Sequence, residues 1–341
     1  MRDDGLPRSD WYAGVVTVDW IDDPEAFVAR DWTALVEVDP EGTLFHTPRY
    51  LKLYWEEFGA ETLRIAIVRR GGEPNAAAAF DLRGGVLTWL GGFDLTDYMG
   101  PVGLPDGRDA AAKEVMTAVA SRDDWREADL AGLPARSAWL AALRAGAEAA
   151  GLAAAVETDA VAPFLRLPGS YDAYLDGLSG KLRHEIRRKE RRLGEAFPGA
   201  GLVDATAETM SEDLERFMDL HRSSPGEKGR FMVPGMELFF RRLADSLLPE
   251  GTLRLVFLES EGRALAGAVG FRDGDRFLLY NSAYDHTLGA VSPGMVLLSE
   301  LIRSAIDEGR RGFDMLKGDI PYKYRYGARP RRISRLRLRR S

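Results

Sequence analysis

One stretch near the end of the chain, residues 276–328, limits the possible fold more than any other. It opens with a short, aromatic apolar run, Phe277–Tyr280, of the kind that forms a buried strand. A polar loop follows and ends in a Ser-Pro-Gly segment at residues 292–294. Apolar residues then recur at helical spacing from Met295 to Ile306, and a second apolar run occupies Phe313–Leu316. The predicted order is strand, loop, helix, strand.

The junction between that loop and the helix predicts an anion site. The first turn of a helix carries unpaired backbone N–H groups and the positive end of the helix dipole, and both attract phosphate. Ser292 can cap the helix, Pro293 fits its first position, and Gly294 lets a ligand approach the backbone. We therefore expect Ser292, Gly294 and Met295 to bind a phosphate-bearing ligand; the alternative is a plain helix cap.

Several short motifs occur in a fixed order along this stretch: Tyr284-Asp285, Ser292-Pro293-Gly294, Gly309, Phe313-Asp314, Gly318-Asp319, Tyr322-Lys323 and Gly327. Together they resemble the BioF2-like, or CelD-type, acetyltransferases of the GNAT superfamily. The resemblance implies a GNAT fold, in which the loop before the helix holds the pyrophosphate of an acyl-coenzyme A. The common GNAT phosphate loop, Arg/Gln-x-x-Gly-x-Gly/Ala, is not present in that form.

The chemistry that the resemblance implies suggests roles for the polar residues of these motifs. Acyl transfer needs a base for the acceptor, a donor that polarises the carbonyl and an acid for the leaving group. Asp319 is the expected base, and the alternative is a turn cap. Tyr322 is the expected acid, with Tyr284 second, and either could instead be a packed tyrosine. Lys323 is expected to hold an anionic group of donor or acceptor; the alternative is a surface lysine.

Composition excludes several kinds of protein. The chain has 341 residues and no cysteine, so disulfides, thiolate metal sites and cysteine nucleophiles are excluded. No two of its four histidines are close enough to suggest a metal-binding pair, and we expect no metal. No run approaches the roughly 18 apolar residues of a membrane span, and the start lacks the features of a signal peptide. A net charge of −7 argues against binding DNA. These features predict a cytoplasmic protein.

The chain is long enough for two domains. Helices and strands interleave in both halves, and a linker is expected near residues 159–163. The predicted fold class is α/β, with α+β mixed sheets in tandem GNAT-like acyltransferase domains. These are an N-terminal GNAT-like domain, residues 1–160, and a C-terminal BioF2-like acetyltransferase domain, residues 161–341. This arrangement also resembles the Fem peptidyltransferases, which use an aminoacyl-tRNA as donor.

Two further segments are candidate substrate-binding sites. The glycine-containing loop at residues 91–101 holds Asp94, Asp97 and Tyr98, a composition that suits a site. The alternative is that the carboxylates only bond to loop N–H groups. The helix expected at residues 181–192 is strongly basic, and Arg183 and Arg187 on it are candidates to bind an anionic substrate. The alternative is a solvated face.

Three functions remain open at this point. The first is an N-acetyltransferase-like enzyme that moves an acyl group from acyl-coenzyme A to an amine or hydroxyl of a small-molecule or sugar acceptor. The second is a Fem-like transferase that forms an amide bond from aminoacyl-tRNA, with salt-sensitive tRNA binding. The third is a non-catalytic accessory protein of polysaccharide biosynthesis, which the missing phosphate loop keeps open.

Overall fold

The computed structural model describes residues 16–23, 30–59, 62–92 and 94–340. The chain forms two compact units. The first runs as far as Asp159 and also includes the chain from Ile333 onward, and the second comprises Ala160–Arg332. Within the described residues, no helix is long and apolar enough to cross a membrane.

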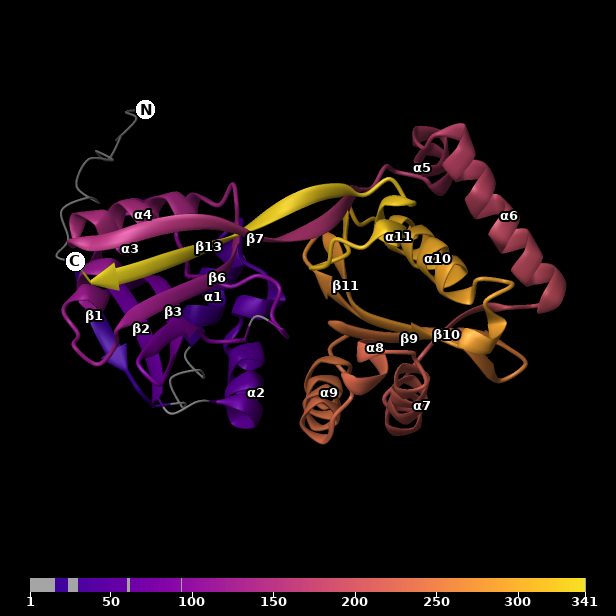
Figure 1. Cartoon of the computed structure of the whole chain (residues 1–341), viewed down its shortest axis with the longest axis horizontal. Helices are drawn as coiled ribbons and strands as arrows, with labels where there is room; N and C mark the ends of the chain where they lie inside the picture. The colour runs from indigo at the N-terminus through magenta and orange to yellow at the C-terminus, as the bar shows by residue number, and fades with distance from the viewer. Residues whose placement is uncertain (1–15, 24–29, 60–61, 93, 341) are drawn as a thin grey trace, which may run out of the picture. The chain divides into compact units, whose positions relative to one another are not determined.

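The first unit is a mixed sheet with helices, in the strand order β1-β2-β3-β4-β6-β13-β7 (Figure 1). Helices α3 and α4 pack side by side over the sheet, and their apolar side chains join the same core as Leu336 and Leu338. The short strand β5 pairs with β3. The strands are β1 (Val16–Ile21), β2 (Thr62–Arg70), β3 (Glu73–Arg83), β4 (Val86–Trp89), β5 (Val102–Gly103), β6 (Glu127–Pro134), β7 (Leu152–Arg166) and β13 (Arg329–Arg340). The helices are α1 (Arg30–Val38), η3 (Leu44–His46), α2 (Pro48–Phe58), α3 (Arg108–Ala120) and α4 (Ala138–Ala149).

Two features of the chain differ from the boundaries expected from the sequence. Residues 159–163, expected as a linker, lie inside the unbroken strand β7, where the carbonyl of Pro163 accepts from Met315 N–H at 2.9 Å. The last strand was expected in a C-terminal domain, yet Ile333–Arg339 pair with β6 of the first unit. Leu336 and Leu338 explain this, because both side chains point to the same face of the strand and are buried in that unit's core.

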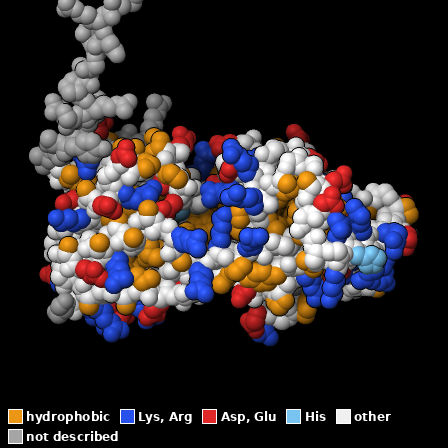
Figure 2. All heavy atoms as spheres, turned by 90° about the horizontal axis from the view of Figure 1, so that it is seen from above, with side chains coloured by type: hydrophobic (Ala, Val, Ile, Leu, Met, Phe, Trp, Pro, Cys, Tyr) orange, Lys and Arg blue, Asp and Glu red, His pale blue; other side chains and the backbone are white. Residues whose placement is uncertain are grey.

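The second unit is a sheet in the order β8-β9-β10-β11-β12-β7 with helices on both faces. Helices α5, α6, α10 and α11 cover one face, and α7, α8 and α9 cover the other (Figure 1). Lys and Arg side chains gather at the end formed by α6 (Figure 2). The strands are β8 (Gly201–Asp204), β9 (Leu253–Ser260), β10 (Arg263–Asp273), β11 (Arg276–Tyr284) and β12 (Gly312–Asp314). The helices are α5 (Tyr171–Gly177), α6 (Gly180–Ala196), α7 (Met210–Arg222), α8 (Glu227–Arg230), α9 (Pro234–Leu247), η4 (His286–Leu288), α10 (Pro293–Asp307) and α11 (Pro321–Tyr324).

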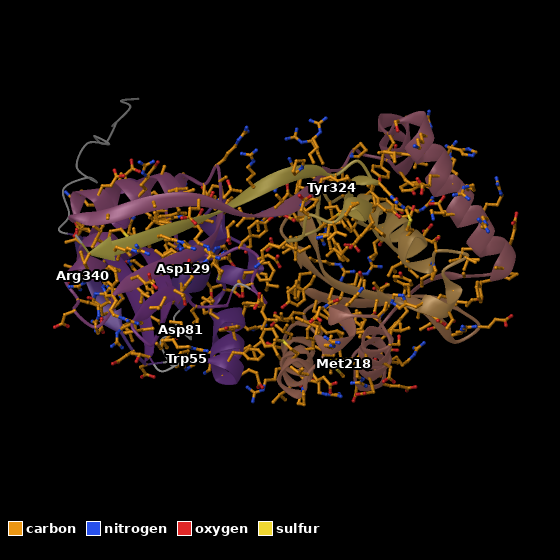
Figure 3. All side chains as sticks on the ribbon, in the orientation of Figure 1. Trp55, Asp81, Asp129, Met218, Tyr324 and Arg340 are labelled. Atoms are coloured by element: carbon orange, nitrogen blue, oxygen red, sulfur yellow. The ribbon has the colours of Figure 1, made fainter. Side chains whose placement is uncertain are left out.

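The predicted order of strand, loop, helix and strand is confirmed as β11, α10 and β12. Apolar side chains on one face of α10 pack against the sheet, as the helical spacing indicates. Helix α7 covers the opposite face of the sheet, where Met218, labelled in Figure 3, is fully buried. Helix α10 is therefore held between the sheet on one side and helices α5 and α6 on the other, where Ser299 donates to Glu190 of α6 at 2.6 Å.

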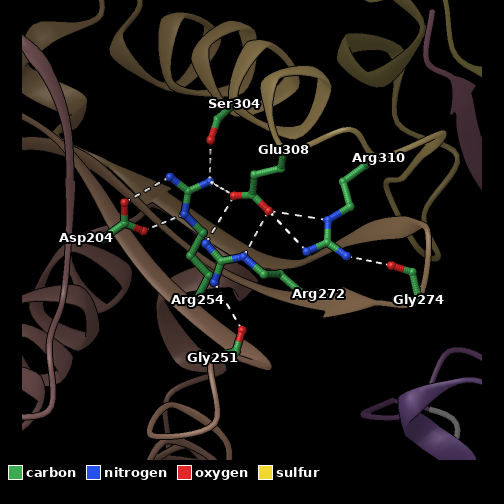
Figure 4. Close-up of polar contacts among 8 residues, drawn as sticks. All are labelled: Asp204, Gly251, Arg254, Arg272, Gly274, Ser304, Glu308 and Arg310. Atoms are coloured by element: carbon green, nitrogen blue, oxygen red, sulfur yellow. Dashed lines mark hydrogen bonds and ion pairs between the residues drawn. The ribbon is translucent and has the colours of Figure 1, made fainter. Parts of the chain in front are cut away.

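A cluster of charged side chains fixes the C-terminal end of α10 to the sheet (Figure 4). Arg254 of β9, whose side chain is 6% exposed, binds Asp204 of β8 at 2.5 and 3.0 Å and donates to Ser304 at 2.7 Å. Glu308, just after the helix, accepts two hydrogen bonds from Arg272 of β10, at 2.9 and 3.1 Å. A buried guanidinium is costly unless it is paired, so these contacts tie three strands to one helix end.

Replacing Glu308 with Gln should lower the free energy of unfolding by about 1–3 kcal/mol, because a neutral amide cannot balance Arg254 and Arg272. Burial raises the pKa of Glu308, but its bonds to Arg272 and the nearby arginine charges outweigh this and lower the pKa below its usual 4.5. The carboxylate therefore stabilises the fold above that pH, and the contribution is lost as pH falls through the folded-state pKa.

Urea unfolding of wild type and Glu308→Gln, from neutral pH to about pH 3.5, measures this difference. It should be largest at neutral pH and shrink on acidification. Asp307→Asn changes an exposed carboxylate in the last turn of the same helix and is the control. A difference that stays constant with pH would contradict the ionic role of Glu308.

Candidate active site

Strand β11 pairs with the short strand β12 only over its first three residues. Their parallel register joins Arg276–Leu278 to Gly312–Asp314 and then stops. Strand β11 continues to Tyr284, whereas the chain after β12 follows β7, as the bond from Met315 N–H to the carbonyl of Pro163 shows. In the described part of the chain, no strand covers this edge of the C-terminal half of β11.

The alternation of hydrogen bonds identifies the backbone groups on this free edge. Asp285 N–H donates to the carbonyl of Leu265 at 3.0 Å, which marks a hydrogen-bonded pair with the β10 side. The register between the two strands runs unbroken from there back to Asn281. Hydrogen-bonded and non-hydrogen-bonded pairs alternate in an antiparallel ladder. The N–H and C=O groups of Ser282 and Tyr284 therefore point away from β10, toward the free edge.

The side chain of Lys323 replaces the lost pairing on the other side of the gap. Its Nζ donates to the carbonyls of Met315, Leu316 and Lys317 at 2.7, 3.1 and 2.8 Å. The side chain is buried, with 5% of the residue exposed. Lys323, expected to bind an anionic group, instead directs its three N–H bonds to backbone carbonyls that β11 does not reach. It keeps the two strands apart.

Lys323→Met should lower the free energy of unfolding by about 2–4 kcal/mol, because it leaves three buried carbonyls without a donor while keeping the volume of the side chain. Chemical denaturation gives the loss, and hydrogen exchange at residues 315–318 should accelerate. Lys113→Met, which changes an exposed lysine of α3, is the control. Equal stabilities of the two variants would refute the structural role of Lys323.

The first turn of α10 is open, although the residues expected to bind a ligand there have other contacts. Ser292 adopts a left-handed backbone conformation, with φ +56°, and its side chain does not cap the helix; its hydroxyl accepts from Lys189 of α6 at 2.9 Å. The N–H of Gly294 has no hydrogen-bond partner in the described part of the chain. Met295 uses its own N–H and C=O groups internally, with Ser292 and with the hydroxyl of Tyr326.

The glycine at position 294 is required by a side chain. A Cβ atom there would lie 2.9 Å from Cδ1 of Tyr284, closer than packed carbon atoms come. Tyr284 is the last residue of the free edge of β11. This contact therefore places the end of the free edge directly against the first turn of α10.

Helix α6 adds positive charge at this end of α10. Burial lowers the pKa of Lys189, and the charges of Arg188, Arg325 and Arg192 lower it further against the opposing effect of Glu185. Arg183, expected to bind substrate, is paired with Asp176 at 2.7 Å. Arg187, the other candidate, is exposed and makes no ion pair with any described residue. The site can thus attract an anion near Lys189.

The three expected catalytic residues divide into two groups. The hydroxyl of Tyr322 bonds to the side chain of Ser282; burial raises the pKa of Tyr322, and this bond offsets part of the increase. Tyr284 lies at the same edge. Asp319 is exposed and accepts from Tyr324, labelled in Figure 3, at 2.5 Å. The structure thus brings Tyr322 and Tyr284 to the free edge and turns Asp319 toward Tyr324.

Residues 180–324, which contain all of these elements, match the family of acetyltransferase (GNAT) domains. This part of the chain is a GNAT-type acetyltransferase domain. No curated protein matched the sequence in a search. The match covers the open edge of β11, the first turn of α10 and Lys323, so these parts of the site belong to the GNAT domain.

Solved structures share the fold of the whole chain at low sequence identity. FemX has a TM-score of 0.67 and 12% identity over 93% of this chain and 96% of its own. A conserved protein of unknown function from Bacteroides thetaiotaomicron VPI-5482 has a TM-score of 0.62 and 13% identity, covering 95% and 100%. The C-terminal domain (DUF2156) of a putative lysylphosphatidylglycerol synthetase from Agrobacterium fabrum has a TM-score of 0.60 and 11% identity, covering 94% and 92%. The predicted mixed α/β fold class is confirmed, and these solved structures share the fold.

The first unit repeats the strand order of the GNAT domain, but its own chain occupies the corresponding gap. Strand β4 pairs in parallel with β6 only at Val86–Thr88, and Met99 N–H from the following loop then donates to the carbonyl of Gly132 at 3.1 Å. Thr96 is fully buried in this loop, and Tyr50 donates to the carbonyl of Leu95 at 2.8 Å.

The loop residues expected to bind substrate take part in this packing. Asp97 and Tyr98 are buried, with 8% and 5% exposed, and the ring of Tyr98 lies 6.5 Å from that of Phe45. Asp94 is exposed. The buried part of this loop therefore packs over the edge of β4 and closes it, although its glycines and carboxylates suggested a binding site.

Sequence reasoning missed four side chains beside the end of β11 in the GNAT domain. His221 of α7 is buried and bonds to Asn281 of β11, and the ring of His286 lies 4.1 Å from that of Tyr284. Lys228 of α8 is near enough to act electrostatically on both histidines. Four separate elements, α7, α8, β11 and η4, supply these residues, so no spacing in the sequence indicates their proximity. The position of His286 just after Tyr284-Asp285 is the one available signal.

Proposed function

We propose that the GNAT domain binds an acyl-coenzyme A along the free edge of β11 and transfers its acyl group to an amine or hydroxyl of a small-molecule acceptor. The observation that carries this proposal is the contact between Tyr284 and Gly294, which joins the free edge to the open first turn of α10. An extended amide chain can pair with the backbone of Ser282 and Tyr284, as a strand would. Its phosphates then reach the N–H of Gly294 and the ammonium of Lys189.

The reaction makes one bond and breaks one. The acceptor nitrogen or oxygen attacks the acyl carbon, whose carbonyl is polarised by a backbone N–H of the free edge, and the carbon–sulfur bond breaks. The leaving thiolate takes a proton from Tyr322, and the proton that the acceptor loses returns to the tyrosinate through solvent. Since burial raises the pKa of Tyr322, its hydroxyl stays protonated at neutral pH and can act as that acid.

Lys189→Met should weaken binding of acetyl-coenzyme A by roughly 10- to 100-fold, because it removes one charge-assisted contact to phosphate. Isothermal titration of the purified chain measures the dissociation constant. Arg191→Met is the matched control, because Arg191 lies on the same helix and pairs with Glu195 at 3.7 Å on an exposed surface. Unchanged affinity in Lys189→Met would place the donor elsewhere.

Tyr322→Phe should reduce kcat by about 100-fold or more while leaving the dissociation constant of the donor unchanged. Release of free thiol from acetyl-coenzyme A follows the reaction. Tyr324→Phe removes an exposed hydroxyl from the same short helix and should retain activity. Full activity of Tyr322→Phe would exclude this tyrosine as the acid.

A second donor, aminoacyl-tRNA, is favoured by one observation on α6. Arg187, Arg188 and Arg192 form no ion pair with described residues, so this helix presents uncompensated charge to a polyanion. A parallel titration with charged tRNA at two salt concentrations distinguishes the donors. Tight, salt-sensitive binding of tRNA without binding of acetyl-coenzyme A would support this alternative, and binding of neither would support a non-catalytic role.

A further inference from the structure

Three basic side chains near the end of β11 have hydrogen-bonding atoms that no described residue satisfies. His221 is 1% exposed, and its Nδ1 has no partner, which leaves Nε2 for the bond to Asn281. The Nε2 atom of His286 is also buried without a partner. The side chain of Lys228 makes no hydrogen bond or ion pair within the described part of the chain. Buried polar atoms are almost always paired in folded proteins, so the two buried imidazole nitrogens indicate a ligand. Lys228 is an exposed residue, and partial desolvation lowers the pKa of its ammonium.

The charges around these side chains do not balance. Burial lowers the pKa of His221 to about 4, and the positive charge of Lys228 adds to the effect. Burial lowers the pKa of His286 as well, and the positive charge of Lys228 lowers it further, whereas the negative charge of Asp285 raises it. Asp285 cannot serve as counter-ion to Lys228, because its carboxylate is held by Arg263 at 2.7 Å and by the hydroxyl of Thr287 at 2.5 Å. The described residues therefore supply no counter-ion for the ammonium of Lys228, which can bind an anionic ligand.

We propose that the acceptor is an amine that also bears a carboxylate, and that Lys228 binds the carboxylate while His286 receives the proton of the amine. A single ammonium between neutral imidazoles suits a monoanion better than a phosphate dianion, for which a site collects several donors. The inference rests on the proposed function, because it places the acceptor at the free edge that binds the acyl donor.

The position of His286 fits this role. It follows the free edge after one residue, and its ring packs on that of Tyr284. In the tautomer protonated at Nδ1, the Nε2 lone pair can accept a hydrogen bond from the acceptor amine. As the carbon–nitrogen bond forms, the nitrogen becomes acidic and its proton passes to Nε2, while the thiolate takes the proton of Tyr322. His286 then releases its extra proton to solvent, and Tyr322 regains a proton from solvent.

The test compares amino acids with their carboxamides, which keep the amine and side chain and lose the anion. With acetyl-coenzyme A and wild-type protein, kcat/KM should be at least about tenfold higher for the best amino acids than for their amides. In Lys228→Met this preference should fall to near unity, with the dissociation constant of the donor unchanged. Arg230→Met, an exposed neighbour in α8 that pairs with Glu227, should keep the preference.

A second measurement does not depend on turnover. In NMR spectra of wild type, amino acids at millimolar concentration should shift the ring signals of His286 and His221, and their amides should not. In Lys228→Met, neither the amino acids nor the amides should shift these signals. If amino acids and amides behave alike in both experiments, the inference is overturned. Failure of acetyl-coenzyme A to bind would overturn the proposed function instead, and the NMR comparison would still decide whether Lys228 recognises a carboxylate.

Discussion

The whole site depends on two parallel strands that stop pairing. Where β11 and β12 separate, each loses hydrogen bonds, and the two sides are satisfied differently. On the β12 side, the buried ammonium of Lys323 takes three carbonyls, so that side is complete without a ligand. On the β11 side, the backbone of Ser282 and Tyr284 is left for a molecule that can pair like a strand. Because Lys323 binds the carbonyls after β12, that segment does not pair with β11, and the backbone groups of Ser282 and Tyr284 stay available to a ligand.

Helix α10 places its first turn beside this free edge, and different interactions fix the two ends of the helix. At its C-terminal end, Arg254 and Glu308 bind it to three strands through buried charge. At its N-terminal end there is no cap; the ring of Tyr284 packs against Gly294, and Lys189 holds the hydroxyl of Ser292. A helix so fixed can leave its first turn open, since its position does not depend on the groups that bind the ligand.

The sequence predicted the elements of the GNAT domain better than the roles of its residues. Helical spacing and two short apolar runs were enough to place β11, α10 and β12, because burial of one face determines that pattern. The role of Lys323 could not be predicted, since it follows from the loss of pairing between strands far apart in the chain. Asp319 was expected in the site because it follows a strand, but its contact with Tyr324 depends on the turn into α11. His221 and Lys228 approach β11 only in three dimensions.

The route of the last strand has a consequence for how the chain acquires its structure. Strand β13 lies between β6 and β7, although its part in the first unit, from Ile333 onward, is synthesised after every residue of the second. During synthesis the first sheet therefore has exposed edges at β6 and β7 until the chain is nearly finished, and exposed edges invite pairing with other chains. Completion of the first unit must wait for the second to emerge from the ribosome, so the order of folding along this chain cannot simply follow the order of its residues.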